Sequence, residues 1–208
     1  MKLFCFLPLL LVLCGCAREI SPVSALALDR TGDRYCLTAE VVRQDAPDDT
    51  VAPAYLSADG ADVTEALQHL RSILPGDLYL SHAQVLLLSE SAASESILPL
   101  TDYLCHENDV RLSLRTAVVR NGTAAALLEN NDEVYALSEL LDRAAQEGIL
   151  PDMPLYRVAE VLHADGTAIL PALQADAYGQ TAPAGTAIFR NERLSCFLDG
   201  EIGGGAHA

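Results

Sequence analysis

Residues 78–89 read LYLSHAQVLLLS, and the second half of this stretch, from Val85 to Leu88, is an uninterrupted aliphatic run. A run without polar alternation is typical of a central strand that is covered on both faces of a sheet. The stretch follows Pro75-Gly76, a pair that stops a helix. We therefore expect residues 78–89 to form a strand in the middle of the sheet.

The segment before this strand predicts an amphipathic helix that opens at Asp62. The Asp62 side chain can accept a hydrogen bond from a first-turn amide, and Glu65 three residues on has the spacing of a capping box. One face of the helix is apolar: Val63, Ala66, Leu67, Leu70, Ile73 and Leu74. Similar patterns predict further helices over residues 91–105 (with Pro99 early in it), 132–147 (stopped by Gly148) and 155–163 (with Pro154 in its first turn).

Runs of β-prone residues predict the other strands. They cover residues 23–29, 35–42, 111–120, 167–174, 186–190 and 194–198. The first two form a hairpin around Gly32, whereas the acidic segment 44–60, which carries Pro47 and Pro53, is an expected loop. The sum is an α+β fold, a mixed β-sheet with packed helices, with a candidate boundary between two subdomains at residues 148–154.

The N-terminus predicts a lipoprotein signal peptide over residues 1–15. Lys2 precedes a short apolar run, and Leu13-Cys14-Gly15-Cys16 has the form of a bacterial lipobox. Cleavage after Gly15 would leave Cys16 as the first residue, carrying diacylglycerol through a thioether. The alternative is an ordinary cleaved signal peptide that happens to contain cysteines.

The charge of the chain excludes nucleic acid as a partner. The formal net charge of −16 becomes −17 once Lys2 is removed with the signal peptide, because Lys2 is the only lysine. Binding to phosphate backbones needs clustered cations, and an anionic membrane surface repels such a chain as a whole. Attachment to a membrane must therefore come from the acyl chains, such as palmitate, on Cys16.

The other cysteines of the mature chain, Cys36, Cys105 and Cys196, are widely spaced. They are compatible with one disulfide plus a spare thiol. The interpretation that we favour is three small buried residues, because Cys196 shares an alternating face with Leu194 and Leu198. No spacing of these cysteines predicts a metal site.

His82, with Asp77 and Glu90 near it in sequence, is the single candidate for acid–base chemistry. A carboxylate could orient the imidazole as a general base in a secreted hydrolase. The alternative is a polar residue near a strand entry that bonds to neighbouring backbone. No phosphate-binding glycine loop, nucleophile elbow or His-Glu-x-x-His helix accompanies His82. We therefore expect no enzyme activity and no cofactor.

Residues 77–90, DLYLSHAQVLLLSE, resemble a signature of the Ger(x)C spore germination lipoproteins, the C subunits of nutrient germinant receptors. Asp77, His82, Gln84 and Glu90 carry this motif. Other segments resemble the family in the same order along the chain: 15–20, 26–29, 109–112, 185–194 and 198–201. One departure is Ala17, where the family usually has an aromatic residue.

The resemblance implies a non-enzymatic lipoprotein subunit, anchored through Cys16 on the outer face of the spore inner membrane. Its partners would be the integral membrane A and B subunits, and the four motif residues would be structural or contact residues. An alternative is a solute-binding lipoprotein that captures a small ligand itself.

The resemblance also sets the expected domain organisation. Residues 16–150 would form the germination-protein N-terminal α+β domain and 151–201 its continuation as a helix and β-hairpin. Residues 202–208 would be a disordered tail. Members of this family normally continue into a further C-terminal domain, which we expect to be absent here.

Overall fold

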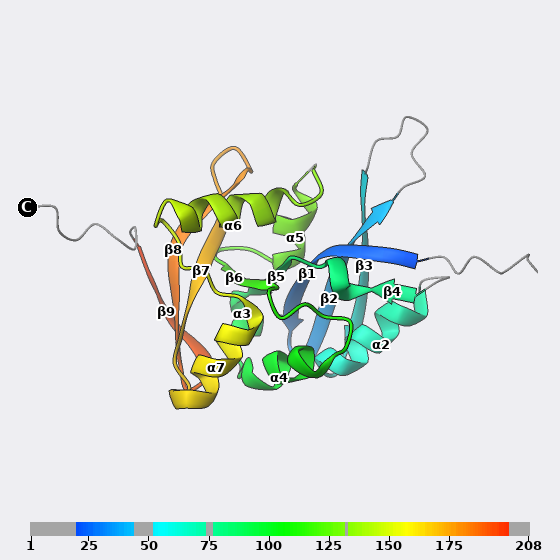
Figure 1. Ribbon diagram of the computed structural model, residues 1–208, viewed down its shortest axis with the longest axis horizontal. Helices are drawn as coiled ribbons and strands as arrows, with labels where there is room; N and C mark the ends of the chain where they lie inside the picture. The colour runs from blue at the N-terminus through cyan, green and yellow to red at the C-terminus, as the bar shows by residue number, and fades with distance from the viewer. Residues whose placement is uncertain (1–19, 44–51, 74–76, 132, 200–208) are drawn as a thin grey trace, which may run out of the picture.

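The computed structural model describes residues 20–43, 52–73, 77–131 and 133–199, in which a mixed nine-stranded sheet has helices on both faces (Figure 1). The signal peptide, Cys16 and the predicted tail 202–208 lie outside the described residues. The strands are β1 (Ile20–Thr31), β2 (Arg34–Arg43), β3 (Ala52–Gly60), β4 (Asp77–Tyr79), β5 (Val85–Ser89), β6 (Arg115–Val119), β7 (Ala168–Ala175), β8 (Thr181–Arg190) and β9 (Arg193–Leu198). The helices are α2 (Val63–Ile73), α3 (Glu90–Ala93), α4 (Leu98–His106), α5 (Ala124–Glu129), α6 (Ala136–Gln146) and α7 (Leu155–Asp165), with a 3₁₀ turn, η1, over Leu80–His82.

The centre of the sheet is parallel and its flanks are antiparallel. The strand order is β3-β2-β1-β5-β6-β7-β8-β9, and β4 pairs with the start of β1. β1, β5, β6 and β7 run in the same direction. On each flank the neighbouring strands alternate in direction: β2 and β8 run opposite to the centre, and the edge strands β3 and β9 run with it. This arrangement confirms the predicted α+β fold with a mixed sheet, and also the hairpin over residues 23–42.

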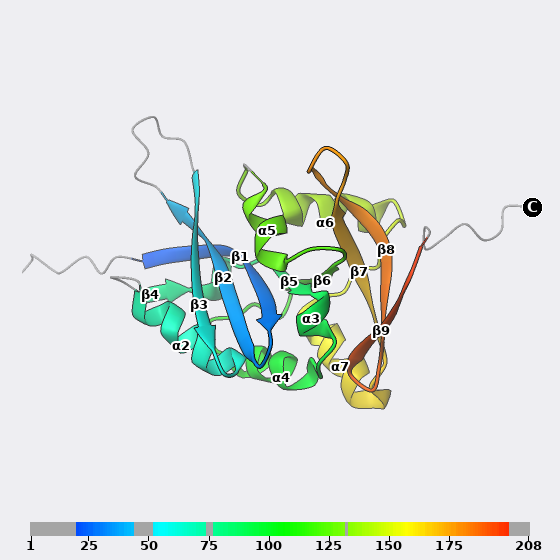
Figure 2. The same ribbon diagram turned by 180° about the vertical axis from the view of Figure 1, so that it is seen from behind.

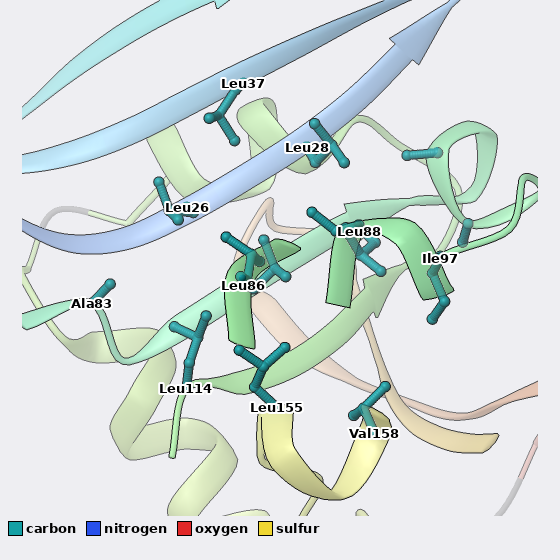
Figure 3. Packing of buried hydrophobic residues seen from close by; sticks show 14 of the residues in the cluster. Leu26, Leu28, Leu37, Ala83, Leu86, Leu88, Ile97, Leu114, Leu155 and Val158 are labelled. Atoms are coloured by element: carbon teal, nitrogen blue, oxygen red, sulfur yellow. The ribbon is translucent and has the colours of Figure 1, made fainter. Parts of the chain in front are cut away.

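β5 lies between β1 and β6 and is buried along its whole length, as its aliphatic run predicts. Alternate residues point to opposite faces of the sheet. Leu86 and Leu88 belong to the core that α2, α3, α4 and α7 cover on one face, and Figure 3 shows them beside Leu155 and Val158 of α7. Val85 and Leu87 belong to the core on the other face, with residues of α5 and α6, and Figure 2 shows these two helices on that side of the sheet. Two hydrophobic cores therefore meet at this strand.

The expectation of a loop over residues 44–60 is wrong for its second half. Residues 52–60 form β3, which pairs with β2 from Tyr35↔Gly60 to Arg43↔Ala52. β3 is an edge strand, and a proline such as Pro53 is tolerated there because an edge strand leaves half of its N–H groups unpaired. The first half of the expected loop, residues 44–51, lies outside the described residues.

Three other predicted elements are interrupted or shorter. The strand over 78–89 divides into β4 and β5, separated by η1, and the helix over 91–105 divides into α3 and α4, with Pro99 in the first turn of α4. The strand over 111–120 begins at Arg115, so Leu112 lies in the preceding loop and is 50% exposed. Short polar interruptions, Ser81-His82 and Ser94 to Ser96, fall where the elements break.

The prediction that Cys196 shares a buried face with Leu194 is also wrong. The pairing of β8 with β9 shifts between Ile188↔Cys196 and Phe189↔Leu194, which leaves Ser195 as an extra residue in the strand. Such a bulge inverts the alternation of side chains. Leu194 and Phe197 consequently pack against the core while Cys196 is exposed.

Candidate functional site

The four residues of the 77–90 motif are distributed along β4, η1 and β5 rather than gathered at one point. Asp77 opens β4 and is exposed, and His82 closes η1 with its ring 5.5 Å from that of Tyr79. Glu90 begins α3 at the opposite end of β5. Because β5 spans five residues, about 3.3 Å each, Glu90 is too far from His82 to orient its imidazole. Of the two carboxylates that the sequence offered to His82, Asp77 and Glu90, the structure therefore does not bring Glu90 to the imidazole.

Gln84 holds neighbouring strands in place through its backbone. Its N–H donates to the carbonyl oxygen of Ser24 at 2.8 Å, and its carbonyl oxygen accepts from the N–H of Arg115 at 2.9 Å. The Glu90 side chain is also engaged, because its Oε1 accepts from the N–H of Asn121 at 2.6 Å. Gln84, just before β5, is thus bonded to β1 and β6, and Glu90, just after β5, is bonded to the turn that follows β6.

At the carboxyl ends of the parallel strands, polar side chains bond to the helices that start there. Asp29, at the end of β1 and 8% exposed, accepts hydrogen bonds from the N–H groups of Ala124 at 2.8 Å and Ala125 at 2.9 Å, the first two residues of α5. Ser89 caps α3 in the same way. Open sheets with parallel strands commonly bind anionic ligands at this edge, on free helix N–H groups. Here Asp29 already occupies the first N–H donors of α5.

Glu40 is a buried carboxyl group that sequence reasoning overlooked. It lies on β2, is 2% exposed, and receives hydrogen bonds from the Ser24 hydroxyl and, at 3.5 Å, from the Tyr55 hydroxyl. Burial raises its pKa, and the hydrogen bonds from Ser24, Tyr55 and the backbone of Tyr135 oppose that rise. The sequence did contain a signal of this buried carboxyl group, because Glu40 is the one charged residue between Tyr35 and Val42.

The Tyr55 hydroxyl lies closer to the carbonyl oxygen of Asn131, at 3.0 Å, than to Glu40, and it shares its single proton between these two acceptors. Tyr135, just before α6, has a φ of +70°, which is unusual for a residue with a side chain. The Glu40 cluster therefore connects β1, β2 and β3 to the segment that joins α5 to α6. Glu40 is almost fully buried, and the contacts of this cluster hold the elements of the fold together.

The three described cysteines are free, and none is fully buried. Cys36 and Cys105 are partly buried, and burial is the main cause that raises the pKa of each thiol. A thiol with a raised pKa is a poor nucleophile at neutral pH. The preferred prediction of three buried cysteines thus fails at Cys196, and no disulfide joins the described cysteines.

Two hollows stand out among the described residues. The first lies between α2 and α4, has a volume of about 260 Å³ and is lined by Leu28, Tyr35, Leu100 and Tyr103 among others. The second lies beside the start of α5, has a volume of about 320 Å³ and is lined by Arg120, Asn121 and Asn130 among others. Ligand sites in proteins usually measure about 300–1,000 Å³, so the first hollow is below that range and the second is at its lower end. Within the described part of the chain, no group of three or more His, Cys, Asp or Glu side chains is placed to hold a metal ion.

None of the described helices is long and apolar enough to cross a lipid bilayer.

Comparison with known proteins identifies the family. The model of the spore germination protein N-terminal domain matches residues 17–175, which include every described element from β1 to β7. No curated protein and no solved structure matches the chain. The match confirms the resemblance that residues 77–90 carry, and it covers well over half of the sequence. The chain therefore belongs to the spore germination protein N-terminal domain family, and its role is in spore germination.

Proposed function

We propose that this protein is a membrane-anchored lipoprotein subunit of a spore nutrient germinant receptor, which acts through contacts with other proteins rather than by catalysis. The observation that carries the proposal is the position of the family match. The matched domain begins at residue 17, directly after the lipobox cysteine Cys16. In this proposal a signal peptide, an acylated Cys16 and the germination domain follow one another without a spacer.

The geometry of the polar groups supports a non-catalytic role. His82, Glu90 and Glu40 are in three separate places, and the last two are held by hydrogen bonds to the fold. A general base needs a partner within hydrogen-bond reach, about 2.6–3.2 Å. A hydrolase that uses Glu90 to orient His82 lacks this arrangement.

The family match supports a germinant receptor as the setting, with the integral membrane A and B subunits as partners. The protein would lie on the outer face of the spore inner membrane. Asp77, His82, Gln84 and Glu90 are proposed structural or contact residues in this assembly. The domain limits of 16–150 and 151–201 remain a prediction.

Two measurements test the proposal. Mass spectrometry of the protein from spore membranes should find diacylglycerol on Cys16, and an unmodified Cys16 would contradict the anchor. Affinity purification from detergent-solubilised spore membranes should recover two multi-spanning membrane proteins in amounts similar to the bait. Their absence from the purified material, with the bait intact and acylated, would contradict the receptor assignment.

A further inference from the structure

The amino-terminal edge of the parallel strands carries a group of exposed apolar side chains. Of the seven large apolar side chains that are exposed in the described residues, four lie in the segments that lead into this edge. They are Ile73 (53% exposed), Tyr79 (38%), Leu112 (50%) and Tyr156 (52%). The other three lie on the strands and turn of residues 168–198. Single exposed apolar residues need no explanation, but four along one edge do.

Backbone contacts connect the segments that carry Tyr79, Leu112 and Tyr156 to neighbouring strands at this edge, and Ile73 ends α2, which precedes β4 in the chain. Pro22 near the start of β1 pairs with Tyr79, and the N–H of Arg115 donates to Gln84 just after η1. The N–H of Tyr156, in the first turn of α7, donates to the carbonyl oxygen of Leu112 at 3.2 Å. We call this the amino-edge surface, made of Ile73, Tyr79, Leu112, Tyr156, Arg111 and Arg157.

Two arginines flank the apolar pair Leu112–Tyr156 directly. Arg111 and Arg157 are both exposed, and neither forms an ion pair with another described residue. Exposed acidic residues lie on the same segments, Asp77, Asp109 and Glu160, but Arg111 and Arg157 are the charged neighbours of Leu112 and Tyr156 in sequence. Apolar and tyrosine side chains beside arginine are the combination that binds at the headgroup level of a bilayer with anionic lipids.

The position of the anchor brings this surface to the bilayer. β1 begins at Ile20, four residues after Cys16, and a chain spans at most about 3.6 Å per residue. Ile20 can therefore lie no more than about 14 Å from an acylated Cys16. The polar headgroup layer takes up roughly half of that reach. Tyr79, opposite Pro22, is consequently held close to the headgroups.

We infer that the amino-edge surface rests on the lipid headgroups, so that the anchored domain has one fixed orientation on the membrane. This inference depends on the proposed anchoring through Cys16. The lipid bilayer is the favoured occupant because Arg111 and Arg157 match anionic headgroups and because the anchor is so short. The net negative charge of the whole chain opposes this approach, so the surface acts only after the anchor has brought the domain to the membrane.

Tryptophan substitutions can test the orientation, because the chain contains no tryptophan. Y79W and Y156W each place a single tryptophan on the amino-edge surface. Y178W is the matched control, since Tyr178 is 91% exposed in the turn after the carboxyl end of β7. Each chain carries a histidine tag in place of residues 1–16. It is attached to vesicles of two parts phosphatidylcholine to one part phosphatidylglycerol that also contain a nickel-chelating lipid.

The tryptophan emission of Y79W and of Y156W should shift to the blue, and brominated phosphatidylcholine should quench it by about half. The emission of Y178W should change little.

The arginines are tested in the Y156W protein. Adding R111Q/R157Q should weaken the quenching of Y156W by about threefold or more. Adding R34Q, at the start of β2 next to the β1–β2 turn at the opposite edge, should leave the quenching unchanged. Equal quenching in all three tryptophan variants, or none in any, would overturn the inference. A blue shift of Y79W and Y156W that occurs only in membranes containing the integral subunits would also overturn the inference, because it would identify a protein as the partner.

Because the tag replaces the lipid, this result does not depend on acylation. Failure of the orientation and failure of the proposed anchor are therefore distinguished. The first appears as unquenched emission from Y79W and Y156W on tethered vesicles, and the second as an unmodified Cys16 in the spore.

Discussion

The two edges of the parallel strands differ in how their polar and apolar groups are used. At the carboxyl edge, Asp29, Ser89 and Glu90 all bond to backbone N–H groups of the protein itself. At the amino edge, Tyr79 exposes apolar surface opposite Pro22 in the first part of β1, and Leu112 is half exposed in the loop before β6. The carboxyl edge, at which such sheets usually hold ligands, is engaged in contacts within the fold, whereas the inferred membrane contact lies at the opposite edge.

This difference indicates where mutations should affect stability and where they should affect attachment. Substitutions at the carboxyl edge should lower the free energy of unfolding, because they leave buried donors without acceptors. Substitutions at the amino edge should leave folding nearly unchanged. The stability predictions below use the chain of residues 17–208 and urea unfolding.

The largest effect is expected for Asp29→Ala. The substitution removes the acceptor of two N–H groups at the start of α5, both beside the buried core. We expect a loss of about 2–4 kcal/mol in the free energy of unfolding. Asp33→Ala is the control, since Asp33 is fully exposed in the following turn and forms a surface ion pair with Arg30; its removal should change stability little. Similar losses for both variants would contradict the assigned role of Asp29.

Glu90→Ala should have the next largest effect. The Glu90 carboxylate accepts from the N–H of Asn121, whose φ of +58° is held in the turn after β6. Loss of this partly exposed hydrogen bond should cost about 1 kcal/mol. Glu129→Ala, on the exposed side of α5, is a control for loss of a surface carboxylate. If Glu90→Ala is as stable as Glu129→Ala, the bond to Asn121 contributes nothing.

Glu40 should make stability depend on pH in the direction opposite to most carboxylates. Its pKa in the folded protein is raised above the ordinary value of 4.5, so folding favours the protonated form. That contribution is complete below pH 4.5 and is lost as the pH rises through the raised pKa. Relative to E40Q, the wild-type protein should therefore lose stability with rising pH, measured by urea unfolding over a pH series. A constant difference between the two proteins would show that the folded pKa is not raised.

The smallest effect on stability is expected at the amino edge. Leu112→Ser with Tyr156→Ser removes two side chains that are about half exposed. The free energy of unfolding should change by less than about 1 kcal/mol, while vesicle binding of the tagged chain should weaken. A large loss of stability would show that these side chains support the fold rather than a binding surface.

Local sequence patterns were sufficient for the elements whose stabilising contacts are local. The predicted cap of α2 forms at Asp62, whose Oδ1 accepts from the N–H of Glu65. Glu65 Oε2 accepts in return from the N–H of Ala61, one residue before the N–H of Asp62 that a capping box uses. The fully buried β5 follows from its aliphatic run. Residues 77–90 also identified the family, which the domain match confirms.

Features that depend on distant contacts could not be predicted in this way. The acceptor for α5 is Asp29, 95 residues away from Ala124, so the segment after Thr123 gave no signal of this bond. β3 is held by its pairing with β2, which overrides the loop-like composition around Pro53. The bulge at Ser195 reverses the face of Cys196, and alternation alone cannot reveal an extra residue.

The central claim, a lipid-anchored germination subunit, is tested most directly by the germination of spores that carry Cys16→Ser. Cys14→Ser, the same substitution two residues away, is the matched control. The account predicts that Cys16→Ser protein is lost from the membrane fraction and that nutrient-triggered germination slows severely, while Cys14→Ser spores behave as wild type. Cys16→Ser spores that keep the protein on the membrane and germinate at the wild-type rate would contradict it.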